Sequence, residues 1–342
     1  MPVSLNYLVK RVFWSVLIII GVIMLSYIII IAAPGDPARI WAGNPRGEKA
    51  SIAIEKARRE LGLDQPLPIQ VLRYTAMVLT GDMGVSIEYK VPVAEVIWRG
   101  LTATLELLIV SYIIGIGIGV TLGVASALRR GSRLDSTAQS LAIILANAPS
   151  FWLGIGLIVV LSQTLGFTGY GRIDPYLAYS TGFHPITGFY LIDSLIEGMP
   201  EVFIDVFLRI LPPAIVVATY PVGLGIRITR ALMAENLNEE YVKAAVAWGV
   251  KRRIIIWKYA FRGTIPSLTQ VMGLAFAYSL IDAMIVEVVF GREGLGSIAY
   301  SVIGKSDYTL ITGLMVTVTI FYILVNTLAD ILQAIIDPRV KL

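Results

Sequence analysis

The sequence predicts an all-α integral membrane protein with six transmembrane helices, and two observations carry this prediction. First, 56% of the 342 residues are hydrophobic and only 15% are charged, which gives a mean hydropathy of +0.76. A single soluble core of this size could not bury so many apolar side chains. Second, the apolar residues gather in six runs, and a helix needs roughly 20 such residues to cross a bilayer.

The first three runs are separated by charged segments. Residues 12–33 contain no charge, residues 101–128 contain only Glu106, and the third run lies within 135–172 and carries Pro149. The first run is longer than the roughly 7 to 15 apolar residues of a signal peptide core. An uncleaved first helix is therefore favoured over a cleaved signal peptide.

The last three runs are interrupted by prolines or acidic residues, and lie at 209–227, about 264–290 and 308–336. The interruptions are Pro212, Pro213 and Pro221 in the fourth run, Asp282 and Glu287 in the fifth, and Asp330 in the sixth. Because proline removes a helix donor, the third and fourth runs are expected to kink or unwind at their prolines.

Basic residues in the short loops predict the orientation. Arg129, Arg130 and Arg133 lie between the second and third runs, and the segment between the fourth and fifth runs carries eight basic residues against three acidic ones. Short loops rich in lysine and arginine stay in the cytoplasm. We therefore expect a multi-pass protein of the cell (plasma) membrane with both of these loops and both chain termini in the cytoplasm.

Residues 34–100 then form a long external insert between the first two helices. Its six prolines divide it into short pieces, and residues 49–61 place apolar side chains among charges as an amphipathic helix does. The expected domains are residues 1–33 with the first helix, an extracellular insert over 34–100, and a five-helix membrane core over 101–342. This core includes a cytoplasmic loop over 235–262.

The composition also excludes several kinds of chemistry. The chain has no cysteine and a single histidine, His184, so it offers no disulfide, no thiolate metal site and no histidine metal cluster. The net charge is only +4 and no basic low-complexity run is present, so nucleic acid is not an expected partner. Redox chemistry and zinc chemistry are not expected either.

Three glycines of the second run share one helix face. Gly115, Gly119 and Gly123 lie four residues apart, whereas Gly117 falls between them on another face. Small residues at this spacing let a neighbouring backbone approach closely. We expect a packing face here, with a helix interface that slides as the alternative.

Four acidic residues stand in or near the apolar runs, where an ionised side chain costs at least about 2.5 to 3.5 kcal/mol at mid-depth. Glu106 and Asp330 are near helix ends, so solvation at the membrane interface is the expected explanation for both. Asp282 and Glu287 are candidates for a path through the membrane, and their spacing of five disfavours a paired proton relay. The candidates for the path are Pro149, Ser150, Trp152, Asp282 and Glu287.

Residues 299–306 fit a loose phosphate-loop pattern, but we reject this interpretation. The first glycine is missing, and the segment follows an apolar run instead of a β-strand. Any role driven by ATP would therefore need a separate subunit.

The loop over 235–262 is the most informative segment. Acidic residues precede small helix-forming residues, a glycine ends the pattern and basic residues follow, as expected of a short helix along the cytoplasmic surface. Its small residues suit a groove in a partner protein better than anionic lipid, which is the alternative. The residues expected to contact this partner are Glu239, Glu240, Lys243, Ala244, Ala245, Gly249, Arg252 and Arg253.

At this segment the chain resembles the permeases of ATP-binding-cassette (ABC) importers, whose cytoplasmic loop carries a small-residue pair followed by glycine. The whole chain is similar to the first permease subunit of the dipeptide, oligopeptide and nickel importer family. Seven blocks in the family's order carry this resemblance. They are Ala33-Pro34-Gly35-Asp36-Pro37, residues 61–68, Gly81-Asp82-Met83-Gly84, residues 102–106, Pro149-Ser150-Phe151-Trp152, Glu287-Val288-Val289-Phe290 with Gly294-Leu295-Gly296, and Asp337-Pro338-Arg339.

The resemblance implies a transport subunit and not an enzyme. It implies a six-helix permease core that pairs with a homologous second permease subunit, two ATPase subunits and an extracellular solute-binding protein. ATP and Mg²⁺ would be bound by the ATPases, this chain would bind no cofactor, and the loop over 235–262 would contain the coupling helix. Lys243 stands where the general importer pattern has glutamate, and residues 172–205 look longer than usual.

The solute is the open question at this stage. Peptides are the first choice within the family and oligosaccharides the second, with nickel also known there. A proton-coupled secondary transporter would predict an internal repeat and a paired acidic centre, which the sequence lacks. An intramembrane enzyme would need a catalytic dyad or a metal set, which His184 alone does not provide.

Overall fold

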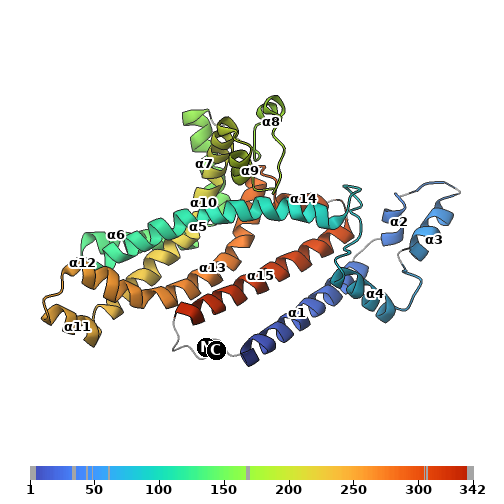
Figure 1. Cartoon of the computed structure of the whole chain (residues 1–342). Helices are drawn as coiled ribbons and strands as arrows, with labels where there is room; N and C mark the ends of the chain where they lie inside the picture. Colours follow the sequence, from blue (N-terminus) through green and yellow to red (C-terminus); the bar gives the residue numbers. More distant parts are fainter. Residues whose placement is uncertain are drawn as a thin grey trace. The chain divides into compact units, whose positions relative to one another are not determined.

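The computed structural model describes residues 5–32, 36–43, 45–47, 49–60, 62–166, 170–303, 305 and 307–336. The described part is helical apart from loops and one isolated antiparallel bridge between Val85 and Pro92 (Figure 1). The helices are α1 (Leu5–Ala32), α2 (Pro37–Trp41), α3 (Ala50–Glu60), α4 (Leu67–Leu79), α5 (Val93–Leu128), α6 (Arg133–Asn147), α7 (Ser150–Leu165), α8 (Pro175–Thr181), α9 (Tyr190–Ile196), α10 (Pro200–Asn236), α11 (Glu240–Ala247), α12 (Arg252–Ile254), the π-helix η1 (Ile255–Ala260), α13 (Phe261–Val289), α14 (Leu295–Ile303) and α15 (Tyr308–Ile336). The sequence block Asp337-Pro338-Arg339 and residues 33–35 of the first block lie outside the described residues.

The predicted membrane helices are confirmed. Five stretches of the described chain are long and apolar enough to cross a membrane, and α6 with α7 makes a sixth if this bent pair is one span. The bend between α6 and α7 is 103° and falls at Pro149, as the sequence predicts. In contrast, α10 contains Pro212, Pro213 and Pro221 and continues unbroken over 37 residues. Of the two expected outcomes, unwinding is therefore wrong, and a kink stays a prediction.

The chain forms two compact units. Unit 1 comprises residues 1–7, 102–296 and 324–342, and unit 2 comprises residues 8–101 and 297–323. Unit 2 therefore contains the 34–100 insert together with most of α1 and the first half of α15.

In unit 1, the three glycines of α5 pack against α10. A Cβ atom on Gly119 would lie 3.0 Å from the carbonyl oxygen of Val222 and 3.1 Å from the Cα of Gly225, and one on Gly123 would lie 2.6 Å from Thr229. A Cβ on Gly117 would meet nothing within 4 Å. The predicted packing face is therefore confirmed, because only glycine permits this approach of the two helices.

The segment that precedes α10 folds back onto it. Phe183, two residues after the end of α8, packs against Val202 and Val206, which lie one turn apart on α10. Arg209 of α10 donates to Asp205 at 2.9 Å and to Asp174 at 3.1 Å. These contacts fix the segment before α10, which belongs to the 172–205 stretch expected to be longer than usual, to the first turns of that helix.

In unit 2, α4 packs between α1 and α15. Ile23 of α1, Val78 of α4 and Val316 of α15 form one buried apolar cluster. Beyond α4, the hydroxyl of Ser86 donates to the Asp307 carboxylate at 2.5 Å and ties the bridge region to the start of α15. The amphipathic helix predicted over 49–61 is confirmed as α3.

Candidate functional site

A small polar pocket lies at the break between α6 and α7. Its volume is about 230 Å³, and its lining comes from the break itself, from one turn of α10 and from Asp282 of α13. The hydroxyl of Ser150 donates to the Asp282 carboxylate at 3.0 Å. The structure thus brings together three residues predicted for the path, Pro149, Ser150 and Asp282, although 132 positions separate Ser150 from Asp282 in the chain.

This pocket holds one carboxylate, that of Asp282, together with the amide and hydroxyl groups of Asn147, Ser150, Thr219 and Tyr220. The last carbonyl groups of α6 have no donor within their own helix. Pro221 has no N–H, so the carbonyl of Val217, four residues before it in the lining turn of α10, also lacks its helical donor. The Asp282 carboxylate in this pocket favours ligands that carry a positive charge.

The other two predicted path residues lie elsewhere. The Trp152 side chain is 65% exposed on α7 and does not line the pocket. Glu287 is fully buried, and its carboxylate accepts the backbone N–H of Gly296 at 2.8 Å. A Cβ on Gly294 would lie 2.2 Å from this carboxylate, which explains why the chain has glycine there. In this structure Glu287 therefore stabilises the turn before α14.

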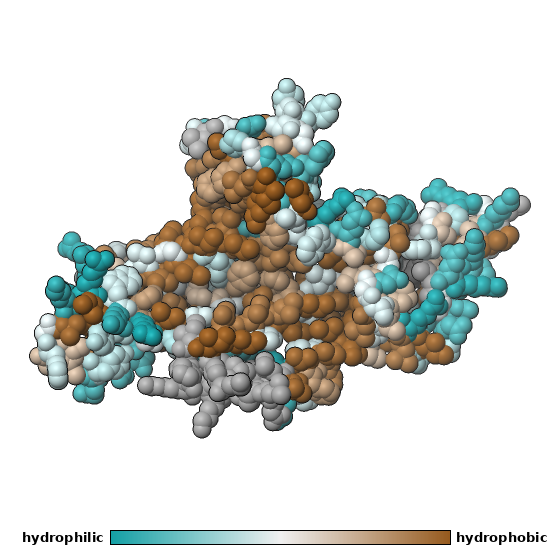
Figure 2. Space-filling model, viewed as in Figure 1, coloured by the Kyte–Doolittle hydropathy of each residue, from teal (hydrophilic) through white to brown (hydrophobic). Residues whose placement is uncertain are grey.

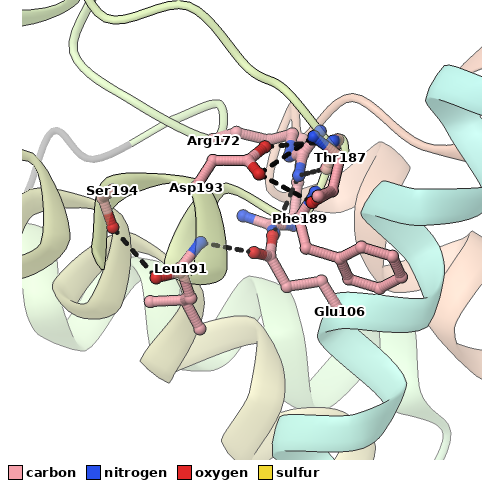
Figure 3. A network of polar contacts seen from close by, with 9 residues as sticks. Glu106, Arg172, Thr187, Phe189, Leu191, Asp193 and Ser194 are labelled. Atoms are coloured by element: carbon pink, nitrogen blue, oxygen red, sulfur yellow. Dashed lines mark hydrogen bonds and ion pairs between the residues drawn. The ribbon is translucent and has the colours of Figure 1, made fainter. Parts of the chain in front are cut away.

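A buried ion cluster surrounds Glu106, and the sequence-based expectation for this residue is wrong. Glu106 is only 3% exposed and accepts from Arg172 at 3.0 Å, from Arg292 at 2.9 Å and from the backbone N–H of Leu191 at 2.8 Å. Figure 3 shows the carboxylate directed at the 172–194 segment, where Asp193 caps the backbone N–H groups of Thr187 and Gly188. Ion pairing, not solvation at the interface, compensates the charge of Glu106.

The two arginines of this cluster were missed by the sequence analysis. The Arg172 guanidinium lies 3.5 Å above the centroid of the Tyr190 ring and also donates to the carbonyl of Gly188 at 2.7 Å. Burial lowers the pKa of Arg292 to about 10, against the opposing effect of Glu106, so it stays cationic at neutral pH. The sequence signal that could have revealed them is the acidic residue Glu106 in an apolar run, together with an isolated arginine in each of two later loops.

The predicted surface helix of the 235–262 loop is confirmed as α11. Its buried side chains, Val242 and Ala245, pack against Ile255 of η1. The helix ends before Gly249, whose φ of 71° lies in the left-handed region that glycine adopts without strain. The backbone N–H of Val250 donates to the carbonyl of Ala245 at 3.1 Å and closes the helix end.

The outer face of α11 is exposed. Ala245 faces inward, whereas the remaining residues predicted to contact a partner are exposed: Glu239, Glu240, Lys243, Ala244, Gly249, Arg252 and Arg253. Lys243 donates to Glu240 at 2.8 Å, and this contact lowers the pKa of Glu240. Trp248, which the sequence analysis did not select, is 87% exposed beside them. An exposed tryptophan next to a small-residue face is typical of a protein interaction surface.

A multi-span helical bundle with a polar pocket at a helix break, and a short exposed helix in the loop between α10 and α13, indicates a class of membrane-embedded transport subunits. The chain belongs to the family of inner membrane components of binding-protein-dependent transport systems. Residues 119–342 match this family, and residues 4–108 match the family of its N-terminal component.

Similar proteins cover nearly the whole chain. It is 39% identical over 334 residues to the probable D,D-dipeptide transport system permease protein DdpB of Escherichia coli (strain K12), covering 97% of this chain and 96% of that protein. It is 34% identical to the dipeptide transport system permease protein DppB of the same strain, covering 98% and 99%. It is 32% identical to the di/tripeptide transport system permease protein DppB of Pseudomonas aeruginosa (strain UCBPP-PA14), covering 98% and 99%.

These matches confirm the resemblance that the sequence blocks indicated. The chain is a multi-pass permease subunit of an ABC importer, and the proton-coupled secondary transporter is disfavoured.

Proposed function

We propose that this subunit forms half of the translocation path for short peptides. The observation that carries the proposal is the end-to-end similarity to permease proteins whose names specify dipeptides or di/tripeptides, at 32% to 39% identity. The Asp282 carboxylate in the pocket supports it, because a peptide carries an ammonium group. Neutral oligosaccharides carry no cation, so this carboxylate favours them less.

The path is proposed to run past the pocket at the α6–α7 break, with Pro149, Ser150 and Asp282 along it. Trp152 is proposed to face the path or the second permease subunit from its exposed position on α7. Glu287 is assigned a positioning role, because its carboxylate is enclosed by the Gly294–Gly296 turn.

The proposed assembly contains a homologous second permease subunit, two ATPase subunits that bind ATP and Mg²⁺, and an extracellular solute-binding protein. The outer face of α11 would dock on an ATPase, with Ala245 holding this helix on η1 from below. The proposed orientation places both termini and α11 in the cytoplasm. The proposed domains are residues 1–33, the external insert 34–100 and the permease core 101–342.

Uptake into vesicles tests the proposed function. The chain is co-expressed with candidate ATPase, second-permease and binding-protein subunits, and the purified complex is reconstituted with ATP inside the vesicles. ATP-dependent accumulation of a labelled dipeptide, but not of a labelled trisaccharide, is the expected result. Accumulation of the sugar alone would contradict the peptide assignment, and a chain that binds no ATPase would contradict the proposed assembly.

Substitutions on α11 test the coupling surface. Trp248→Ala removes the most exposed ring of this surface, and we expect the ATPase to dissociate or its transport-linked activity to fall. Trp14→Ala is the matched control, because Trp14 is an exposed tryptophan of α1, remote in sequence from α11. Equal ATPase binding and transport in both variants would exclude α11 as the docking helix.

A further inference from the structure

Helix α4 of the insert presents apolar residues on two neighbouring faces. One face, with Val71, Thr75 and Val78, is buried. The face beside it carries Ile69, Leu72, Ala76 and Leu79, spaced three or four residues apart, and all four are exposed. Leu72 is 63% exposed, and Arg73 is the only charged residue between Leu67 and Leu79. An exposed apolar stripe of this kind is expected on a surface that meets lipid or a partner.

Contacts with two membrane-crossing helices indicate how deep in the membrane α4 lies. Val78 packs against Ile23, which lies nine residues before Ala32, the last residue of α1. At 1.5 Å per residue, this is about 14 Å inside that end. Val78 also packs against Val316, eight residues and therefore about 12 Å from the start of the α15 span at Tyr308.

The two depths agree and are less than half of a hydrocarbon layer of about 30 Å. The other end of α4 lies nearer the surface, because Gln70 accepts a hydrogen bond at 3.0 Å from Tyr27, close to the end of the α1 span. With 13 residues, α4 is about 20 Å long and too short to cross the bilayer. It therefore enters one leaflet and does not leave by the other side.

The neighbouring helix α3 shows that the stripe is not a general property of the insert. Five of its 11 residues are charged, and two ion pairs, Lys56–Glu60 and Glu55–Arg59, lie along its exposed surface. Figure 2 shows hydrophilic side chains over the α3 region of the insert. Within one insert, α3 carries the side chains of a helix in water and α4 those of a helix in lipid.

We propose that α4 is embedded in the leaflet on the side of the insert, with Ile69, Leu72, Ala76 and Leu79 against lipid acyl chains. In the proposed orientation this is the outer leaflet. The exposed apolar surface of α1 meets the same layer, and α4 continues it. Arg73, at the edge of the stripe, reaches toward the headgroups. The insert is thus an external domain that is anchored in the membrane as well as by its two flanking helices.

The absence of cysteine from the chain makes a direct test possible, because a single introduced cysteine is the only attachment site on this subunit. A nitroxide label is attached to Leu72→Cys or Ala76→Cys, both on the stripe, and to Ile52→Cys on α3 as the matched control. The full chain is placed in phosphatidylethanolamine–phosphatidylglycerol vesicles, alone and with cysteine-free partner subunits. Collision rates of the label with oxygen, which concentrates in lipid, and with a polar nickel chelate, which stays in water, are then measured.

We expect both stripe labels to collide with oxygen several-fold more often than with the chelate, and the Ile52→Cys label to show the reverse. Frequent collisions of the stripe labels with the chelate would place α4 in water and overturn the proposal. Stripe labels that neither reagent reaches would show that protein covers this face, and loss of oxygen access only in the assembled complex would identify a partner subunit as the occupant. Either result would also overturn it. Two independent stripe positions guard against one variant that fails to fold.

Discussion

Two groups of opposite charges in unit 1 differ in their burial and in the sequence separation of their members. Glu106, Arg172 and Arg292, which precede and follow α10 in the chain, form a cluster with side chains 1% to 4% exposed. After α10 ends, Glu240 and Lys243 form a pair with side chains 90% and 58% exposed. The first group joins residues 66 and 186 positions apart, whereas the second joins residues three apart.

This difference separates charges that maintain the fold from charges available to another protein. A buried ion cluster is costly to assemble and far more costly to break, since removal of one member leaves the others uncompensated. An exposed pair contributes little to stability because water solvates both partners. The buried cluster therefore fixes the 172–194 segment and the turn before α14, while the pair on α11 remains free to exchange its partner.

The largest expected effect is that of Glu106→Gln. This variant keeps the shape of the side chain but leaves two buried guanidinium groups without a counter-charge, at a cost of about 3 to 5 kcal/mol. We expect a large fall in the thermal unfolding midpoint of the purified complex. We also expect a protease to cleave the 172–194 segment before it cleaves other parts of the chain. Glu240→Gln is the matched control and should leave the midpoint unchanged. Equal unfolding midpoints for both variants would contradict the claim that the buried cluster stabilises the fold more than the exposed pair does.

An intermediate effect is expected for Asp135→Asn. Asp135 accepts from Arg230 at 2.9 and 3.0 Å, from Ser126 at 2.5 Å and from the backbone N–H of Gly131 at 2.9 Å. Because the Arg230 side chain is 27% exposed, water can partly replace the lost partner, and the cost should be about 1 to 2 kcal/mol. A midpoint between those of the Glu106 and Glu240 variants is expected. A fall in the unfolding midpoint as large as that of Glu106→Gln would show that the stability contribution of these ion pairs does not depend on their solvent exposure.

The smallest effect on stability is expected for Lys243→Gln, for which the unfolding midpoint should not change. The same variant should alter ATPase docking, because it removes one of the exposed charges of α11. The measurement is the affinity of the ATPase subunit at low and high salt, since an exposed charge contact weakens as salt rises. An unchanged affinity and salt dependence would mean that Lys243 is not part of the docking surface, even if α11 is.

The features that could be predicted from the sequence are those set by local composition. Apolar run length predicts the membrane helices, the spacing of Gly115, Gly119 and Gly123 predicts their packing face, and Gly249 predicts the end of α11. Each of these depends on residues within a few helical turns. The break at Pro149 belongs to the same class.

The errors concern contacts between distant segments. The sequence predicts an interfacial position for Glu106 because its partners, Arg172 and Arg292, lie in loops whose conformation no local sequence pattern specifies. The pairing of Ser150 with Asp282 is equally non-local. The prolines of α10 predict unwinding from their own chemistry, but packing of α5 and α6 against this helix maintains it, as occurs in membrane helices whose neighbours surround the freed carbonyls.

The unbroken course of α10 has a mechanical consequence. At 37 residues it is about 55 Å long, so it extends well beyond a hydrocarbon layer of about 30 Å. Its bending stiffness is not uniform, because Pro213 and Pro221 each remove a backbone hydrogen bond, and the bond lost at Pro221 belongs to the turn that lines the Asp282 pocket. A load applied at either end of this rod is therefore expected to bend it most beside the pocket, so that the shape of the pocket follows the bending of the helix.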